Sequence, residues 1–263
     1  MDLGLKGRTA LVCGSSAGLG RAIAEALAAE GANVVINSRS PEKLERVRAD
    51  IEEATGARVA VAAGDLADPA AVARVVAAAR DAFGRIDILV TNAGGPPSGP
   101  FEEHSAETWR HWTRQTLESV VDLVREVLPE MKERRWGRIV NVTSITVKQP
   151  VGGLILSNTL RAGVTGFAKT VSNEAAPFGV TVNNVLPGFT RTERLVALAE
   201  ANAARTGGTV ADAYAAWEKE VPAGRLGEPE ELAAVAAFLC SEKAAYVTGQ
   251  SIAVDGGWIK GLF

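Results

Sequence analysis

The stretch Thr9–Gly20, with the sequence TALVCGSSAGLG, gives the strongest indication of the fold of this chain. Its apolar first part, Thr9–Cys13, predicts a buried strand, and the amphipathic pattern near Leu19–Glu30 predicts the helix that follows. The glycine spacing G-x-x-x-G-x-G lets the backbone turn tightly and approach a pyrophosphate at the free N–H groups of that helix. An ordinary strand–helix turn is the alternative reading, but glycines placed between a strand and an amphipathic helix favour a dinucleotide-binding loop.

The rest of the chain repeats this alternation of strand and helix. Strands are predicted at seven places: Thr9–Cys13, Asn33–Asn37, Arg58–Val61, Ile86–Thr91, Arg138–Val142, Val180–Leu186 and Ser251–Val254. Helices are predicted near Leu19–Glu30, Pro41–Thr55, Pro69–Phe83, Ala106–Glu133, Leu154–Ala176 and Pro229–Ser241. Such alternation indicates an α/β protein with right-handed crossovers, and the continuous apolar strands indicate a sheet covered on both faces. We therefore predict a single-domain Rossmann fold over residues 1–263, with a doubly wound, mostly parallel seven-stranded sheet flanked by helices.

One longer insert interrupts the pattern, at about residues 189–227. It is rich in alanine, so we expect it to be helical and to cover the site as a lid. Its apolar residues either contact a partly apolar substrate or pack the lid onto the body of the protein. They are Leu195, Val196, Leu198, Tyr214 and Trp217.

Composition argues against several classes of protein. The 31 acidic and 28 basic residues leave a net charge of −3, which favours neither nucleic acid nor an anionic membrane as a partner. Cys13 and Cys240 lie in apolar runs, so we expect no disulfide framework and predict a reducing cytoplasm as the location. No apolar run approaches the length of a membrane helix, and the N-terminus lacks the apolar segment of a signal peptide.

Further elements follow the glycine loop in order along the chain. They are Asp65-Leu66, Asn92-Ala93-Gly94, Pro187-Gly188 with Thr192 beyond it, Val247–Gln250 and Val254–Gly257. Jointly these elements resemble the short-chain dehydrogenase/reductase family over residues 8–257, and the chain is most similar to the 3-oxoacyl-acyl-carrier-protein reductase-like branch. The resemblance implies an NAD(P)-dependent oxidoreductase that acts on a small molecule. One departure is Cys13, where the family usually has threonine.

The resemblance also implies which residues contact the cofactor. The set comprises the glycine loop, the end of the second strand and the elements quoted above: Gly14, Ser15, Ser16, Gly18, Leu19, Gly20, Ser38, Arg39, Asp65, Leu66, Asn92, Ala93, Gly94, Arg161, Pro187, Gly188 and Thr192. No metal ligand is expected.

The end of the second strand bears on the choice between NADP and NAD. The segment Val35–Arg39 contains no carboxylate that would hydrogen-bond the ribose 2′-hydroxyl of NAD. Ser38 is small, and the guanidinium of Arg39 matches a 2′-phosphate, although a solvated loop arginine is the alternative. Ala17 stands where the family often has a basic residue. We predict NADP as the cofactor, with NAD as the alternative.

The resemblance breaks at the catalytic residues. Family members usually carry an asparagine, a serine and a Tyr-x-x-x-Lys motif whose tyrosine is the general acid/base. Ser144 matches the family serine, but the register of the following helix puts Ser157 at the tyrosine position and Arg161 at the lysine position. Thr116 falls at the asparagine position. We predict Ser144, Ser157 and Arg161 as the catalytic residues, with an altered proton donor.

Serine and arginine at these positions limit the chemistry. Arg161 can bind the ribose or an oxyanion, but it cannot exchange protons near neutral pH. The hydroxyl of Ser157 is a far weaker acid than a phenol. The nearest substitute donors are Lys148 and Gln149, just after Ser144. Others are better explained without a catalytic role: Tyr214 by packing of the lid, His104 and His111 as solvated residues, and Tyr246 as part of the C-terminal signature.

Three functions fit these residues. The favoured one is an NADP(H)-dependent oxidoreductase that interconverts a carbonyl and an alcohol. The intact cofactor elements and the altered centre also fit a dinucleotide-binding protein with little dehydrogenase activity, acting as a sensor or a partner subunit. The third is a non-redox enzyme on the same scaffold, catalysing dehydration or epimerisation.

The resemblance implies a homodimer or homotetramer built on the two longest predicted helices and the C-terminal segment. The helix Leu154–Ala176 carries small residues that permit close approach of a partner helix: Ala162, Gly163, Gly166 and Ala168.

Overall fold

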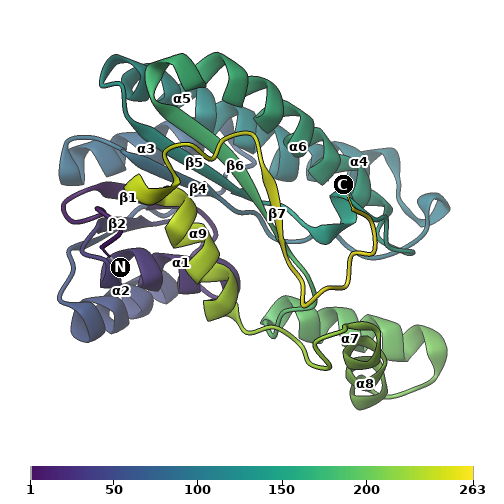
Figure 1. The fold of residues 1–263 in the computed structure, drawn as a ribbon. Helices are drawn as coiled ribbons and strands as arrows, with labels where there is room; N and C mark the ends of the chain where they lie inside the picture. Colours follow the sequence, from purple (N-terminus) through teal and green to yellow (C-terminus); the bar gives the residue numbers. More distant parts are fainter. Residues whose placement is uncertain (1, 263) are drawn as a thin grey trace.

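The computed structural model describes residues 2–262 and confirms the predicted fold class. Seven strands form one sheet in the order β3-β2-β1-β4-β5-β6-β7, and every neighbouring pair is parallel (Figure 1). The strands are β1 (Thr9–Val12), β2 (Asn33–Ile36), β3 (Val59–Val61), β4 (Ile88–Thr91), β5 (Gly137–Val142), β6 (Val180–Pro187) and β7 (Ser251–Val254). The strand order reverses between β1 and β4, and the carboxyl ends of these strands are where such sheets bind ligands.

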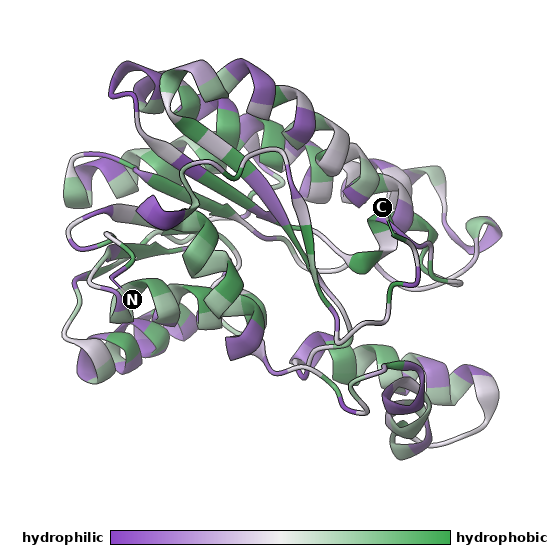
Figure 2. Cartoon of the chain, viewed as in Figure 1, coloured by the Kyte–Doolittle hydropathy of each residue, from purple (hydrophilic) through white to green (hydrophobic). Residues whose placement is uncertain are grey.

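Helices cover both faces of the sheet. On one face lie α1 (Gly18–Ala29), α2 (Pro41–Thr55) and α9 (Pro229–Cys240), and on the other lie α3 (Pro69–Phe83), α5 (Ser119–Glu133) and α6 (Ile155–Ala175). Each face has its own apolar cluster, and Figure 2 shows the strands between them mostly in the hydrophobic colour. Cys13 and Cys240 are buried and unbridged, in agreement with the sequence analysis.

Several boundaries agree with the turn chemistry of the sequence. The helix Pro41–Thr55 begins after Ser40, whose hydroxyl accepts a hydrogen bond from the backbone N–H of Lys43 at 3.3 Å. It ends at Gly56, which adopts a left-handed conformation with φ of 68°. Proline at the first position and glycine after the last therefore place both ends correctly.

The prediction of one continuous helix over Ala106–Glu133 is wrong in the middle of that range. The chain forms α4 (Ala106–Thr113), a π-helical turn (Arg114–Glu118) and then α5. Side-chain hydroxyls on either side of this turn donate to carbonyls four residues earlier: Thr113 to Trp109 at 2.8 Å and Ser119 to Gln115 at 2.7 Å. Such bonds compete with the helical ladder, and the wider turn carries Thr116 into the interior.

The segment at residues 189–227 is helical, as predicted. It contains α7 (Glu193–Thr206) and α8 (Val210–Glu220), which lie beside each other beyond the carboxyl end of β6 (Figure 1). The ring of Phe189 stacks on Trp217 with centroids 5.0 Å apart and meets the edge of Trp258 at 5.8 Å. Tyr214 also packs on Trp217, so aromatic contacts join α8 to Phe189, which in turn contacts Trp258 outside the segment.

Short 3₁₀ turns complete the described structure, at Phe101–Glu103, Ile145–Val147, Ala176–Phe178 and Glu242–Ala244.

A row of polar side chains links four strands at the carboxyl side of the sheet. Thr91 donates to Asn141 at 2.7 Å, Asn141 donates to Asn184 at 3.0 Å, and Asn184 donates to Ser251 at 3.0 Å. Each pair is also a register pair of the parallel ladder. Because a slipped register would leave these amides unpaired, the row fixes how β4, β5 and β6 present the residues that follow them.

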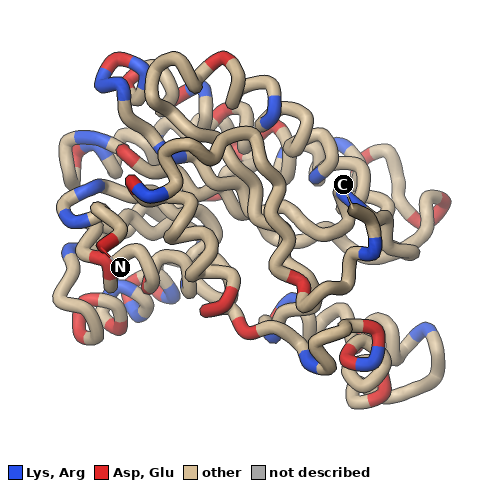
Figure 3. Tube along the Cα trace, viewed as in Figure 1, with Lys and Arg blue, Asp and Glu red and all other residues tan. Residues whose placement is uncertain are grey.

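Charged residues lie mainly on the helices and peripheral loops, and the strands are drawn mostly in tan (Figure 3). Among the helices described within residues 2–262, none is both long enough and apolar enough to cross a bilayer.

Candidate functional site

A groove of about 830 Å³ runs along the carboxyl ends of the strands. Its wall includes all three predicted catalytic residues and most of the predicted cofactor contacts: Gly14, Ser16, Gly18, Leu19, Ser38, Arg39, Asp65, Leu66, Asn92, Ala93, Gly94, Ser144, Ser157, Arg161, Pro187, Gly188 and Thr192. The fold therefore brings residues spread over most of the chain to one surface, as the switch point of a doubly wound sheet predicts.

Two of the predicted contacts, Ser15 and Gly20, do not line this groove. Ser15 is fully buried, and its hydroxyl donates to the carbonyl of Val12 at 2.8 Å. At Gly20, a Cβ would collide with the carbonyl of Gly14, so the glycine allows α1 to pack against the loop. Both residues shape the loop from behind, and their predicted contact with the cofactor stays a prediction.

The turn between β1 and α1 suits an anionic group. Gly14 has φ of 59°, and its carbonyl accepts a hydrogen bond from the side chain of Asn92 at 3.2 Å, which ties this turn to the end of β4. The first turn of α1 contains no acidic residue, and Ala17 at its N-cap offers no side-chain cap. The free N–H groups of this helix end and its dipole therefore remain to bind a phosphate.

The opposite end of the groove, beside β2 and β3, is cationic. Arg39 and Lys43 line it and are exposed, and no carboxylate stands directly after β2. Lys43 lies in the first turn of α2, where it adds its charge to the positive end of the helix dipole. The sequence analysis did not identify Lys43, because only the three-dimensional turn at Ser40 brings it beside Arg39. Asp65 and Leu66 line the adjoining wall.

The predicted catalytic residues lie together at the other end of the groove. Ser144 follows β5, and its hydroxyl oxygen accepts a hydrogen bond from the backbone N–H of Thr146 at 3.2 Å. Its own proton is therefore free to be donated into the groove. Ser157 and Arg161 project from α6 and are only 7% and 8% exposed. The arrangement offers two hydroxyls and one guanidinium, but no phenol.

Arg161 is held by the end of β5. Its Nη1 donates to the carbonyl of Val142 at 2.9 Å and to that of Thr143 at 2.8 Å. Burial and, to a smaller extent, the nearby positive charge of Arg194 lower the pKa of the guanidinium to about 10. Arg161 therefore stays protonated at neutral pH, so it acts as a fixed cation and not as an acid or base.

Thr116, at the position where the family has asparagine, faces the same region. It is buried, and its hydroxyl has no hydrogen-bond partner among the described residues. A cavity of about 10 Å³, lined by Thr116, Arg161 and Asn92, adjoins this hydroxyl. That volume is about the size of one water molecule.

With the exception of His111, the substitute proton donors considered from the sequence do not reach the groove wall. Lys148, Gln149 and Tyr214 are absent from its lining within residues 2–262, and Gln149 instead accepts a hydrogen bond from the backbone of Lys260 at 3.3 Å. His111 does line the groove, at its exposed rim on α4. No buried side-chain acid of the described chain therefore replaces the missing tyrosine.

Sequence reasoning missed one residue at this end, Arg194. It lies in the first turn of α7, lines the groove, and its Nη2 donates to the carbonyl of Pro96 at 2.5 Å. A Cβ at Gly95 would collide with its guanidinium, so the glycine leaves room for the arginine. This contact ties the lid to the loop after β4, across the groove.

Apolar residues form the remaining wall of this end. Leu195 and Leu198 of α7 line the groove, whereas Val196, which the sequence analysis grouped with them, is 42% exposed and points elsewhere. Within residues 2–262, no cluster of His, Cys, Asp or Glu suits a metal ion.

Comparisons with known proteins agree with this site. A family model described as enoyl-(acyl carrier protein) reductase matches residues 14–259. The 3-oxoacyl-[acyl-carrier-protein] reductase FabG of Aquifex aeolicus is 35% identical over 257 residues, which cover 98% of this chain and 99% of the relative. The NADPH-dependent reductase BacG of Bacillus subtilis is 34% identical over 256 residues, covering 97% and 99%. The crystal structure of L-sorbose reductase from Gluconobacter frateurii, complexed with NADPH and L-sorbose, superposes with a TM-score of 0.94 at 35% identity and 100% coverage of both chains.

Proposed function

Because this chain belongs to the short-chain dehydrogenase/reductase family of oxidoreductases, we propose that it uses NADP(H) to interconvert a carbonyl compound and an alcohol. One observation carries the proposal: a single groove joins the cationic end at Arg39 to the hydroxyls of Ser144 and Ser157 beside Arg161. The phosphate-binding turn of α1 lies between these two ends. The residues present thus fit a dinucleotide extended along the groove.

The choice of NADP rests on the end of β2. An exposed arginine and an exposed lysine stand there, at the positive end of α2, and the residues directly after β2 include no carboxylate that would favour the 2′-hydroxyl of NAD. The NADPH in the complexed L-sorbose reductase and the NADPH-dependent BacG are consistent with this choice.

The chemistry divides between the cofactor and the chain. When bound, the reduced nicotinamide supplies a hydride. As the carbonyl carbon gains that hydride, the C–O π pair moves to oxygen and a negative charge develops there. The free protons of Ser144 and Ser157 are placed to hydrogen-bond this oxygen, and the cation of Arg161 stabilises its charge. With no phenol in the site, a proton from water in the open groove completes the alcohol.

A second function is favoured by one specific observation. Nη1 of Arg161 is already committed to two backbone carbonyls of β5 and the following turn, which is how a purely structural arginine behaves. A dinucleotide-binding protein with little dehydrogenase activity would retain the groove and need no proton donor.

Anaerobic mixing with NADPH and a panel of ketones separates these functions. The proposal predicts a ketone-dependent loss of nicotinamide absorbance. Tight NADPH binding with no absorbance change for any ketone would instead support the dinucleotide-binding function.

Cofactor choice is tested by calorimetric titration of the wild type and of Arg39→Ala. We expect NADP(H) to bind more tightly than NAD(H), and the substitution to weaken NADP(H) by about fivefold while leaving NAD(H) unchanged, since an exposed ion pair contributes roughly 1 kcal/mol. Arg46→Ala, on α2 and outside the groove wall, is the matched control. Unchanged NADP(H) affinity in Arg39→Ala, or tighter binding of NAD(H) by the wild type, would contradict this choice.

We further propose that the protein acts as a homodimer or homotetramer through α5 and α6. On α6 the small residues Ala162, Gly163 and Gly166 are exposed, whereas Ala168 is buried within the subunit and takes no part. Light scattering at micromolar concentration checks the assembly, and a monomer would contradict it.

A further inference from the structure

Two arginines without a carboxylate partner face the same end of the groove. Arg161 is 8% exposed and Arg194 is half-buried, and both line the groove. Burial lowers the pKa of each guanidinium, and no described carboxylate opposes that shift at either one. Buried cations are normally paired, so this end of the groove carries positive charge that the chain itself does not neutralise.

The two guanidinium groups also act on each other. The charge of Arg194 is close enough to lower the pKa of Arg161, so their mutual repulsion is an unfavourable contribution in the free protein. One edge of each group is fixed by backbone carbonyls, those of Val142 and Thr143 for Arg161 and that of Pro96 for Arg194. Each guanidinium has further N–H donors beyond these bonds. A ligand anion placed between them would use those donors and relieve the repulsion.

The other charged groups of the groove do not neutralise this end. Arg39, Lys43 and Asp65 lie at the far end, after β2 and β3. Glu193 is the one acidic residue in the groove wall near α7. It is exposed and forms no ion pair with Arg161 or Arg194 among the described residues.

Apolar side chains also line the groove around the two arginines. Leu195 and Leu198 of α7, Val151 and Leu154 before α6, and Trp112 of α4 complete this end of the groove. A ligand that fits here combines an anionic group with a hydrocarbon part.

We propose that the substrate is a carbonyl compound that carries a carboxylate and an apolar chain, and that Arg194 binds the carboxylate. The inference rests on the proposed function and deepens it by naming the substrate class. Charge matching supports it: the carboxylate compensates one guanidinium in the ground state, and the oxyanion that develops during hydride transfer compensates the other. A neutral ketone would leave one of the two cations unpaired throughout.

The test compares an acid with its neutral analogue. Hexanoate and hexanamide are titrated into the NADP⁺-bound protein, with intrinsic tryptophan fluorescence, to which Trp112 in the groove wall contributes, as the readout. We expect hexanoate to bind at least tenfold more tightly than hexanamide. Arg194→Gln should abolish this difference, whereas Arg194→Lys should restore part of it. In turnover, 2-oxohexanoate and 3-oxohexanoate should exceed their methyl esters in kcat/KM by a similar factor.

Arg191→Gln is the matched control. Arg191 lies three residues earlier, outside the groove wall, and pairs with Glu218 at 2.9 Å and Glu228 at 3.2 Å. This variant should keep the preference for hexanoate. Because hexanoate binding needs no turnover, this experiment can succeed even if the protein proves to be no reductase.

Two results would overturn the inference. One is equal or weaker binding of hexanoate relative to hexanamide by the wild type, including a failure of both to bind. The other is an Arg194→Gln variant that keeps the preference but loses affinity for NADPH, because Arg194 would then serve the cofactor's phosphates.

Discussion

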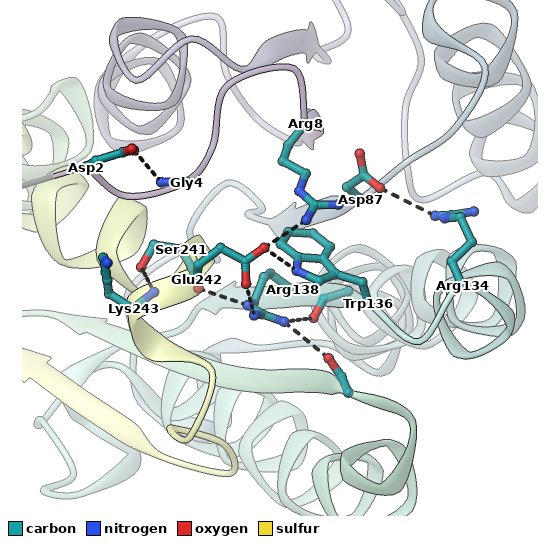
Figure 4. Close-up of polar contacts among 12 residues, drawn as sticks. Asp2, Gly4, Arg8, Asp87, Arg134, Trp136, Arg138, Ser241, Glu242 and Lys243 are labelled. Atoms are coloured by element: carbon teal, nitrogen blue, oxygen red, sulfur yellow. Dashed lines mark hydrogen bonds and ion pairs between the residues drawn. The ribbon is translucent and has the colours of Figure 1, made fainter.

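A buried arginine lies at each end of strand β5: Arg138 at its start, and Arg161, which projects from α6, at its carboxyl end. The two differ in whether the protein supplies a counter-charge. Arg138, at the start of the strand, is 2% exposed and is surrounded by acceptors (Figure 4). It donates to the carbonyls of Ser241 at 3.1 Å, Gly137 at 2.9 Å and Gly179 at 3.2 Å. A carboxylate oxygen of Glu242 lies 3.7 Å from its Nη2.

The same cluster continues around Glu242. This carboxylate also accepts from Arg8 and from the indole N–H of Trp136, each at 2.8 Å. The guanidinium groups of Arg8 and Arg138 lie over the ring of Trp136, at 3.7 Å and 4.5 Å from its centroid. Burial lowers the pKa of Arg138, but the negative charge of Glu242 opposes that shift. The chain itself supplies the counter-charge at this end.

At the carboxyl end of β5, Arg161 has two carbonyls but no carboxylate. Its nearest charged influence is a second arginine, Arg194, which makes its burial less favourable. An uncompensated buried cation is costly for folding and is characteristic of functional sites. Arg138 is thus compensated within the fold, whereas the proposed ligand would supply the counter-charge beside Arg161.

Replacement of Arg138 should cause the largest effect on stability. Arg138→Met removes three hydrogen bonds and leaves buried carbonyls and Glu242 without their partner, so we expect a loss of about 3 kcal/mol in the free energy of unfolding. Urea denaturation measures it. Arg125→Met, which removes an exposed arginine paired with Asp122, is the control and should change stability by less than about 0.5 kcal/mol. If Arg138→Met itself changed stability by less than about 0.5 kcal/mol, Arg138 would not stabilise the fold, and the contrast with Arg161 would be wrong.

Replacement of Arg161 should affect turnover instead. In Arg161→Met, the lost hydrogen bonds are offset by removal of an uncompensated buried charge, so stability should change by less than about 1 kcal/mol. Loss of the cation beside the developing oxyanion should lower kcat/KM by about 100-fold. Steady-state kinetics and urea denaturation on the same preparation check both parts. Strong destabilisation with unchanged kcat/KM would show that Arg161 is structural, like Arg138.

Restoring the tyrosine and lysine that the family usually has at positions 157 and 161 tests whether these positions belong to the catalytic site. In Ser157→Tyr with Arg161→Lys, a phenol gains a proton-donor role and the neighbouring lysine lowers its pKa. Turnover of a simple activated ketone should rise by about tenfold, a fraction of the usual general-acid contribution. The same variant should lose activity on a substrate that depends on Arg161 as an anion-binding group. If it folds and matches the wild type in cofactor affinity and in turnover of every tested substrate, catalysis lies elsewhere.

Most of the fold could be predicted from the sequence because its signals are local. Pro41–Thr55 and Pro69–Phe83 were placed correctly since proline and glycine mark their ends. The π-helical turn at Arg114–Glu118 could not be predicted, because its apolar periodicity differs from that of a continuous helix by a single residue. Serines and threonines beside it are common in ordinary helices as well.

The candidate site was predicted where it depends on motifs and missed where it depends on distant contacts. Arg194 reaches the groove through its bond to Pro96, 98 residues away in sequence, which only the folded lid creates. The lack of a counter-charge at Arg161 is likewise a property of the assembled groove. In the same way, nothing local in the sequence shows that Arg138 meets Ser241, 103 residues further along the chain.

The most direct test of the contrast between the two ends of β5 is the stabilisation of the NADP⁺ complex by hexanoate, measured as the free energy of unfolding in urea. A ligand at 100 times its Kd stabilises the native state by about 2.7 kcal/mol. The wild type and Arg138→Met should gain the same increment at a given hexanoate concentration, whereas Arg194→Gln should need at least ten times more hexanoate to reach it. An identical hexanoate dependence in all three proteins would contradict the claim that a bound anion compensates the positive charge at the carboxyl end of β5.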